Sequence, residues 1–294
     1  MKETSAKPSQ SWGCVSVIIV FSLLFLFQGL LGQVTNSILA NVLIVMAATI
    51  VAAGIVAYGV GVAFAIFRVY RALRLRLRYA VPLPIGLMAA EDLPPDVGSQ
   101  IRDFAAALAP LGYKLIGCLH VVPARVPAHV ALAHHNRAGT IARCVLSPQG
   151  TQLERYLVFR TRLSDGTEYA TTHMSRRAYS LIRRAPAPNR SVLTFFDIDD
   201  PTRLARLHEA AVERRASARV DTGTIDPLKF HAETVENEMA TQVEAGYLSL
   251  QGDEYRTTPS GGMKMALKAL RPIAARRIRS AERKAAQFLA ETGL

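Results

Sequence analysis

Two long apolar segments lie in the first quarter of the chain. They cover residues 15–31 and 38–67, and no charged side chain occurs between Lys7 and Arg68. A helix needs about 20 apolar residues to cross the hydrocarbon core of a bilayer, and these segments approach or exceed that length. Because the six residues 32–37 between them are polar or small, the pattern predicts a transmembrane hairpin that follows a short segment, 1–14.

The charges around this hairpin predict its orientation. Five arginines follow the second segment within eleven residues, and Lys2 and Lys7 precede the first. Lys and Arg accumulate on the cytoplasmic side of a span, so we expect a two-span protein of the inner (plasma) membrane with both termini in the cytoplasm. The membrane-surface residues of this segment are Arg68, Arg71, Arg74, Arg76 and Arg78.

An apolar segment after two lysines is also typical of a cleaved signal peptide. The residues "GLLGQ" at its end make a poor cleavage site, which favours a span instead. Cleavage would leave residues 68–294 on the same side of the membrane. Neither span contains an ionisable residue, so no ion or proton pathway is predicted.

Small residues recur every four positions in the second apolar segment. They are Ala53, Ala57, Gly61 and Ala65. Small side chains at this spacing let two helices approach closely. The stripe therefore predicts a helix-packing face, used either by the first span or by a second copy of the chain in a homo-oligomer.

The residues after the membrane segments predict an α+β domain. A basic and proline-rich stretch, 68–95, is expected to link the hairpin to a domain at 96–200. Asp96 is expected to cap a helix that ends near Gly112. Short alternating or β-branched segments follow, with a hairpin signal at 164–166, and they indicate a mainly antiparallel sheet. These segments are 113–122, 129–136, 140–147, 153–163 and 167–174.

The last third, 201–294, is expected to be largely helical. Asp200-Pro201 and Asp226-Pro227 are typical starts of helices, with Asp as the cap and Pro in the first turn. A small hairpin is expected at 247–258, and Thr258-Pro259 opens a final helix that Pro272 should kink or split.

The final helix is amphipathic and basic. Its arginines and lysines surround one apolar stripe, a pattern found in helices that bind membrane surfaces, partner proteins or nucleic acids. The same pattern also occurs in helices that pack on their own domain and leave a solvated basic face. The membrane-surface residues predicted on this helix are Arg276, Arg277, Arg279 and Arg283.

Residues 235–262 resemble the end of a winged-helix module. They contain the end of a helix, a glycine stop, a two-stranded wing and Thr-Pro before the next helix. The resemblance covers about thirty residues and implies either DNA binding or a wing used for packing or dimerisation. Two helices, rather than three, can be placed before the wing. The acidic helix before it would repel phosphate, which counts against a nucleic-acid partner and leaves it as an alternative. Its acidic residues are Glu233, Glu236, Glu238 and Glu244.

Charge and chemistry-bearing residues add little evidence for catalysis. The net charge of +12 is concentrated in residues 68–78 and 264–294, whereas 79–263 are neutral overall. The three cysteines, at unrelated spacings, are expected to be free thiols. Cys118 and His120 share a strand face, which makes them the best catalytic pair, but the same pattern is typical of residues that line the core or one face of a sheet.

Other candidate sites are equally weak. His129, His134 and His135 lack a further ligand at zinc-like spacing, and Asp197 with Asp199 would make an ordinary acidic loop. No phosphate-binding loop occurs. We therefore predict no catalytic, cofactor-binding or metal-binding residues.

The hypothesis from the sequence is a membrane-anchored, cytoplasm-facing interaction or regulatory protein. Its partners would be the lipid bilayer and the anionic headgroups that its basic segments contact. Two alternatives remain: a membrane-tethered DNA-binding regulator and, below it, an enzyme acting near the membrane.

Overall fold

The computed structural model describes most of the chain after the first apolar segment. The described residues are 38–76, 78–80, 87–121, 128–135, 139–149, 152–181, 189–215, 226–268 and 270–294. The chain divides into two compact units, Met1–Phe64 and Ala65–Leu294. The predicted span at 15–31 lies outside the described residues, so the two-helix hairpin stays a prediction.

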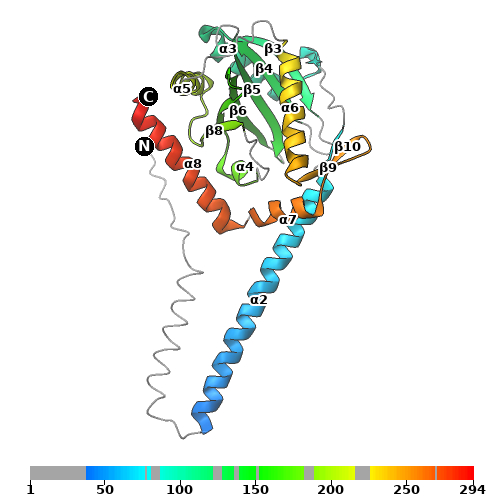
Figure 1. Ribbon diagram of the computed structural model, residues 1–294, viewed down its shortest axis with the longest axis vertical. Helices are drawn as coiled ribbons and strands as arrows, with labels where there is room; N and C mark the ends of the chain where they lie inside the picture. Colours follow the sequence, from blue (N-terminus) through cyan, green and yellow to red (C-terminus); the bar gives the residue numbers. More distant parts are fainter. Residues whose placement is uncertain are drawn as a thin grey trace. The chain divides into compact units, whose positions relative to one another are not determined.

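The second apolar segment forms one long helix, α2 (Ile38–Arg76) (Figure 1). Its stretch Val42–Arg68 is long and apolar enough to cross a membrane, and it is the one such helix found among the described residues. The helix continues through Arg68 and the basic residues after it, where a linker was expected. Arg, Leu and Ala have high helix propensity, which explains why the basic segment extends the helix.

A seven-stranded sheet forms the centre of the unit Ala65–Leu294 (Figure 1). Its strands follow chain order from edge to edge, β2-β3-β4-β5-β6-β7-β8. Neighbouring strands are antiparallel except β7 and β8, which are parallel and are separated in the chain by α4 (Arg176–Leu181). The strands are Leu87–Met88, Lys114–Val121, Ala128–His135, Thr140–Gln149, Gln152–Arg162, Glu168–His173 and Arg190–Phe195. The predicted α+β class is therefore confirmed.

Three helices cover one face of this sheet and form the main core. They are α3 (Pro95–Leu108), α5 (Pro201–Glu213) and α8 (Arg271–Thr292). Phe159 of β6 packs in this core with Phe104 of α3 and Leu204 of α5. Full burial of each such side chain contributes about 1.5–3 kcal/mol.

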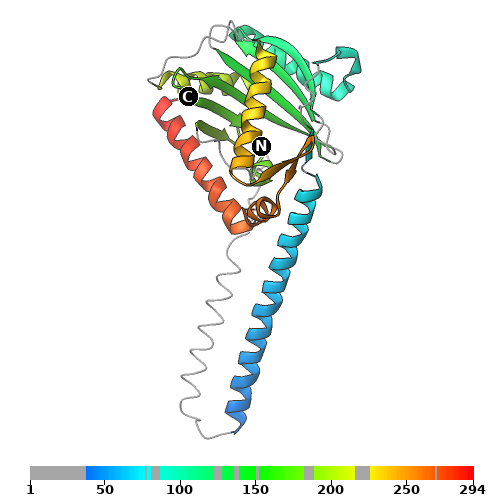
Figure 2. The same ribbon diagram turned by 45° about the vertical axis from the view of Figure 1, so that its right-hand side comes forward.

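A single helix, α6 (Pro227–Glu244), lies across the opposite face of the sheet, as the second view shows (Figure 2). Its Phe230 packs on a small apolar cluster contributed by the strands β3, β4 and β5. The strand members of the cluster are Leu119, Val130, Leu132 and Ile141. Towards β6, β7 and β8 this face carries the charged residues Arg160, Arg162, Glu168 and Arg190, so α6 covers an apolar half and a charged half.

The predicted wing is part of a separate three-stranded sheet. β9 (Leu248–Gln251) and β10 (Glu254–Thr257) form the expected hairpin, with Gly252 in the left-handed conformation at its turn. β1 (Arg78–Ala80), which the sequence did not predict, adds to β10 on its other side. One residue separates the end of α2 from β1, so the segment that follows α2 is paired to the wing.

Several local predictions can be compared directly with the helix ends. Asp200 and Asp226 accept hydrogen bonds from the backbone N–H groups of Thr202, at 3.0 Å, and of Leu228, at 2.9 Å, which confirms both caps. The cap expected at Asp96 is wrong, because α3 begins at Pro95, and proline favours the first helical position. The expected break near Pro272 separates α7 (Pro259–Lys268) from α8. The short helices η1 and η2 cover Ala90–Asp92 and Ala109–Leu111.

Candidate functional site

The first candidate site is the basic end of α2. Arg68 and Arg71 are exposed on α2. Arg74 and Arg76 belong to the last turns of the same helix, and Arg78 begins β1. The predicted membrane-surface residues thus lie on one continuous helix and the strand that follows it.

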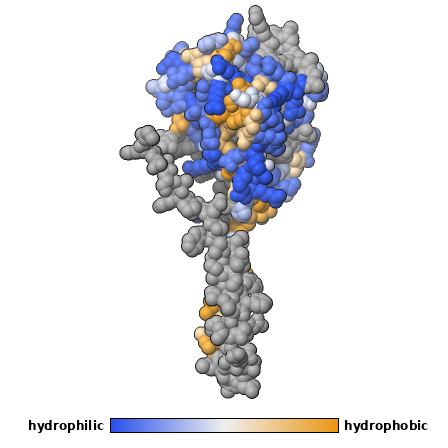
Figure 3. Space-filling view, turned by 90° about the vertical axis from the view of Figure 1, so that its left-hand side faces the viewer, coloured by the Kyte–Doolittle hydropathy of each residue, from blue (hydrophilic) through white to orange (hydrophobic). Residues whose placement is uncertain are grey.

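The terminal helix α8 carries the second group of predicted membrane-surface residues. Arg276, Arg279 and Arg283 are exposed, and Arg279 and Arg283 line an open hollow of about 450 Å³ on this helix. Arg277 is partly buried instead, with its guanidinium carbon 5.3 Å from the centre of the Tyr179 ring. The view from the side on which α8 lies in Figure 1 shows a mostly hydrophilic face (Figure 3). Three of the four arginines are therefore available to a ligand or a surface.

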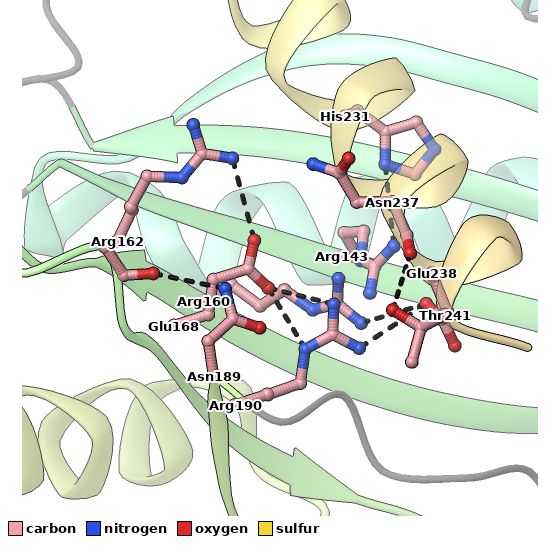
Figure 4. Close-up of polar contacts among 11 residues, drawn as sticks. Arg143, Arg160, Arg162, Glu168, Asn189, Arg190, His231, Asn237, Glu238 and Thr241 are labelled. Carbon is pink, nitrogen blue, oxygen red and sulfur yellow. Dashed lines mark hydrogen bonds and ion pairs between the residues drawn. The ribbon is translucent and has the colours of Figure 1, made fainter. Parts of the chain in front are cut away.

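A cluster of charged side chains lies between α6 and the charged half of the sheet (Figure 4). We call it the arginine cluster. Strand alternation puts its sheet members on the face opposite the main core, because side chains two residues apart share a face. Helical spacing puts its α6 members on the face that covers the sheet. The cluster contains Arg143, Arg160, Arg162, Glu168, Arg190, His231, Glu233 and Glu238.

Two buried or partly buried glutamates bind most of the arginines in this cluster. Glu168, 6% exposed, accepts hydrogen bonds from Nε of Arg190 at 3.0 Å and forms a longer ion pair with Arg162 at 3.6 Å. Glu238 of α6 lies 3.7 Å from Arg160 and 3.5 Å from Arg190. Glu238 therefore links α6 to two strands at once.

Arg143 has no carboxylate partner among the described residues. Its Nη1 atom lies 3.5 Å from Nδ1 of His231, and its buried Nε atom has no hydrogen-bond partner. Arg160, which is 8% exposed, also leaves Nε and Nη1 unpaired. Each buried donor without an acceptor costs about 1–3 kcal/mol, so the arginine cluster is incomplete in its hydrogen bonding.

The pKa values in the arginine cluster reflect this surplus of buried positive charge. Burial and the neighbouring Arg160 lower the pKa of Arg143 to about 9, which leaves it charged at neutral pH. Burial and the charge of Arg143 lower the pKa of His231 to about 3, so this imidazole is neutral. Four arginines thus face three glutamates, and His231 adds no charge.

A second buried polar group, around His208, has its hydrogen bonds complete. His208 of α5 is fully buried in the main core, and both ring nitrogens contact threonine hydroxyls. Nε2 lies 2.9 Å from Oγ1 of Thr161, and Nδ1 lies 3.0 Å from Oγ1 of Thr171. Both ring nitrogens of His208 therefore have hydrogen-bond partners, whereas the arginine cluster contains buried donors without partners.

The cysteines singled out for chemistry in the sequence and described by the structure are buried. Cys118 and Cys144 are buried in the main core, where burial raises the pKa of the Cys118 thiol and raises that of Cys144 to about 12. A nucleophilic thiol needs a lowered pKa, so neither cysteine is activated. The side chain of His120 lies outside what the structure describes.

The candidate metal ligands have other roles. His134 is buried on the sheet face that α6 covers, whereas the ring of His135 packs edge-on against Tyr113 at 5.0 Å. Asp197 accepts two hydrogen bonds from Arg176, at 2.8 and 2.9 Å, which occupies both carboxylate oxygens. Across the described ranges, no group of three or more His, Cys, Asp or Glu side chains could hold a metal ion.

Sequence reasoning missed the arginine cluster. One signal was present: Arg160 and Arg162 alternate with uncharged residues on a strand, and the acidic helix at 227–244 offers complementary charge. The pairing of these charges depends on where α6 crosses the sheet, which no local pattern specifies.

Comparison with protein-family models, with curated proteins and with solved structures finds no match for this chain. The arrangement of the described side chains is therefore the basis for the functional conclusions that follow.

Proposed function

We propose that this chain is a membrane-anchored interaction or regulatory protein whose domain faces the cytoplasm and contacts anionic lipid headgroups. The observation that carries the proposal is the continuity of α2. An apolar helix runs into a basic one without interruption, and one residue later β1 pairs with β10. This arrangement suits a domain held at the membrane surface rather than one released on a long linker.

A contact at the end of α2 supports the same proposal. The ring of Tyr70 packs against Gly262 of α7, where an added Cβ atom would lie 2.8 Å from Cδ2 of the ring. Gly262 is therefore the residue that lets the helix end approach α7. The basic end of α2 therefore contacts α7, and the basic helix α8 follows α7 directly in the chain.

The electrostatic contribution is large enough to matter. Each Lys or Arg near an anionic surface contributes about 1 kcal/mol, within a Debye length. Arg68 and Arg71 on α2 and three exposed arginines on α8 could act together. Arg277 is excluded from this group because it stacks on Tyr179.

The finer topology belongs to the same proposal. It consists of a first span at 15–31, a second at 38–67, an outside turn and two cytoplasmic termini in the inner membrane. The stripe of small residues on α2 would pack on the first span or on a second copy of the chain. Ala53, Ala57 and Gly61 are exposed, and an added Cβ on Gly61 meets no atom within 4 Å.

Hydrogen exchange on the full chain in lipid nanodiscs tests the headgroup contact. We expect slower backbone exchange in α8 when the nanodisc contains anionic lipid than when all its lipid is neutral, and the difference should shrink at high salt. The triple variant Arg276→Glu, Arg279→Glu and Arg283→Glu should abolish the difference.

A matched control separates headgroup contact from a general charge effect. Arg102, Arg203 and Arg206 are exposed on α3 and α5, so their replacement by Glu changes the net charge by the same amount. This control should keep the lipid-dependent protection of α8. Equal exchange of α8 in neutral and anionic nanodiscs would refute the contact.

The two alternatives stay predictions without a supporting feature of their own. A DNA reader would use α6 as its recognition helix, but α6 packs on the sheet through Phe230 and Glu238. An enzyme would need an activated group, and Cys118 has a raised pKa. Neither observation favours these alternatives over the membrane-anchored interaction protein.

A further inference from the structure

The arginine cluster has unused hydrogen-bond donors that point to a missing acceptor. Three guanidinium N–H positions, at Nε of Arg143 and at Nε and Nη1 of Arg160, are buried and have no partner. The hydroxyl of Thr234, on α6, is buried and unpaired as well. Thr234 is 2% exposed and lies one helical turn from both His231 and Glu238, on the face of α6 that covers the sheet.

These donors come from neighbouring positions in the fold. Arg160 of β6 is opposite Ile141 of β5, so Arg143 is its diagonal neighbour on the same face of the sheet. Diagonal neighbours lie roughly 7–8 Å apart at the backbone, which lets two guanidinium groups reach one small ligand. The residue opposite Arg160 on β7 is Ala170, which has a short side chain.

The charges specify the sign of that ligand. Four arginines face three glutamates, and Arg143 has no carboxylate partner among the described residues. Arginine forks match the oxygens of phosphate and carboxylate groups. A phosphate group has more acceptor oxygens than a carboxylate, and the unused donors here outnumber the two oxygens that a carboxylate presents.

We propose that the arginine cluster is a binding site for a phosphate group, held by Arg143 and Arg160 from the sheet and by Thr234 from α6. The ligand is either free phosphate or a small molecule that carries one phosphate group. Glu238 competes with the ligand, because it already occupies one side of Arg160.

The site is independent of the membrane contact proposed above. Its residues lie on β5, β6 and α6, whereas the proposed headgroup contacts lie on α2 and α8. Binding of phosphate to α6 and the sheet together would also tighten the contact between them. A small anion could thereby regulate how firmly α6 is held.

Titration calorimetry on the full chain in maltoside micelles, which contain no phosphate, tests the site. The probes are inorganic phosphate, glycerol 3-phosphate and sodium chloride at matched ionic strength. We expect saturable binding of inorganic phosphate and no heat from chloride. Equal binding of glycerol 3-phosphate would identify a phosphate monoester, including one from a lipid headgroup, as the ligand class. Its failure to bind would restrict the site to free phosphate.

Three variants test the assignment of residues. Arg143→Gln, which keeps a donor towards His231, should weaken phosphate binding at least tenfold, and Thr234→Val should weaken it about threefold. Glu238→Gln should strengthen binding about threefold or more, since it removes the competing carboxylate. Arg155→Gln is the control. Arg155 lies on β6, as Arg160 does, but on the opposite face of the strand, so its replacement should leave the phosphate affinity unchanged.

Opposite outcomes overturn the proposal. Absence of phosphate binding to the folded wild-type chain would do so, and so would equal affinity in the wild type and Arg143→Gln. If Arg143→Gln fails to fold, the opposite shifts expected for Thr234→Val and Glu238→Gln carry the test, and unchanged affinity in both would refute the site.

Discussion

At the scale of residues, a group of buried ion pairs lies between α6 and the sheet. Glu168 and Glu238 neutralise arginines that would be costly to bury alone. Removal of one partner from a buried ion pair is more damaging than the pair is stabilising, because an uncompensated charge stays behind. The loss of unfolding free energy caused by a substitution in the arginine cluster should therefore increase with the burial of the glutamate that is replaced.

Replacement of Glu168 by Gln tests this dependence. Glu168→Gln should lower the free energy of unfolding by about 3–5 kcal/mol, because Arg190 and Arg162 lose their buried partner. Glu233→Gln is the matched control. The Glu233 side chain is 42% exposed and pairs with Arg162 at 3.9 Å, so its loss should cost below about 1 kcal/mol. Chemical unfolding in micelles measures both, and equal costs would contradict the burial argument.

His231 should make stability depend on pH. Burial and Arg143 lower its folded pKa to about 3, whereas an unfolded histidine titrates near 6.5. The unfolded chain therefore binds the proton first as the pH falls. The stability that this group contributes is complete above about pH 6.5 and is lost as the pH falls from there towards 3.

The variant His231→Gln isolates this contribution from other acid-sensitive groups. It keeps an acceptor towards Arg143 but cannot be protonated. Between pH 6.5 and 4 the free energy of unfolding of the wild type should fall more steeply, by up to about 1.4 kcal/mol per pH unit. Parallel pH profiles for the two proteins would show that His231 is not buried as described.

At the scale of elements, the start of α7 packs against both the end of α2 and the residue before the wing. Gly262 accommodates Tyr70 of α2, and Gly261 lies against the backbone of Tyr247 just before β9. Two adjacent glycines thus permit two close approaches. Side chains at these positions would separate α7 from the end of α2 and from the start of the wing.

Alanine at Gly261 and alanine at Gly262 should both destabilise the protein, but only the cost at Gly262 should depend on the side chain of Tyr70. Gly261→Ala meets fixed backbone and should cost about 1–3 kcal/mol whatever residue 70 is. Gly262→Ala meets the ring of Tyr70, so its cost should largely vanish in a Tyr70→Ala background. Gly98→Ala on α3, where the nearest atom to an added Cβ is 3.5 Å away, serves as the control and should be neutral. Additive costs for Gly262→Ala and Tyr70→Ala would argue against the contact.

Local signals account for the elements that the sequence predicted. Asp-Pro pairs specify the starts of α5 and α6, and alternation with turn residues specifies β3 to β7. β8 was missed because its parallel pairing with β7 depends on the intervening chain, and β1 because three residues carry no pattern. The arginine cluster was missed for a related reason, since the partners of Arg160 and Arg190 come from β7 and α6.

At the scale of the whole molecule, the proposal is a membrane anchor that holds a domain with two binding functions. The apolar stretch of α2 supports the anchor, and the basic residues from Arg68 onwards support its orientation. The domain combines an exposed basic helix with a cluster in which buried donors of Arg143 and Arg160 are unpaired. These features fit a protein that works by binding at the membrane surface.

Labelling of single cysteines from each side of the inner membrane tests the central claim most directly. In a chain with Cys14, Cys118 and Cys144 replaced by Ser, Thr35→Cys should react in intact cells with a maleimide that cannot cross the inner membrane. Glu291→Cys, exposed near the end of α8, should react only after the membrane is opened. Reaction of Glu291→Cys in intact cells, or recovery of the chain in the soluble fraction, would contradict a cytoplasm-facing membrane anchor.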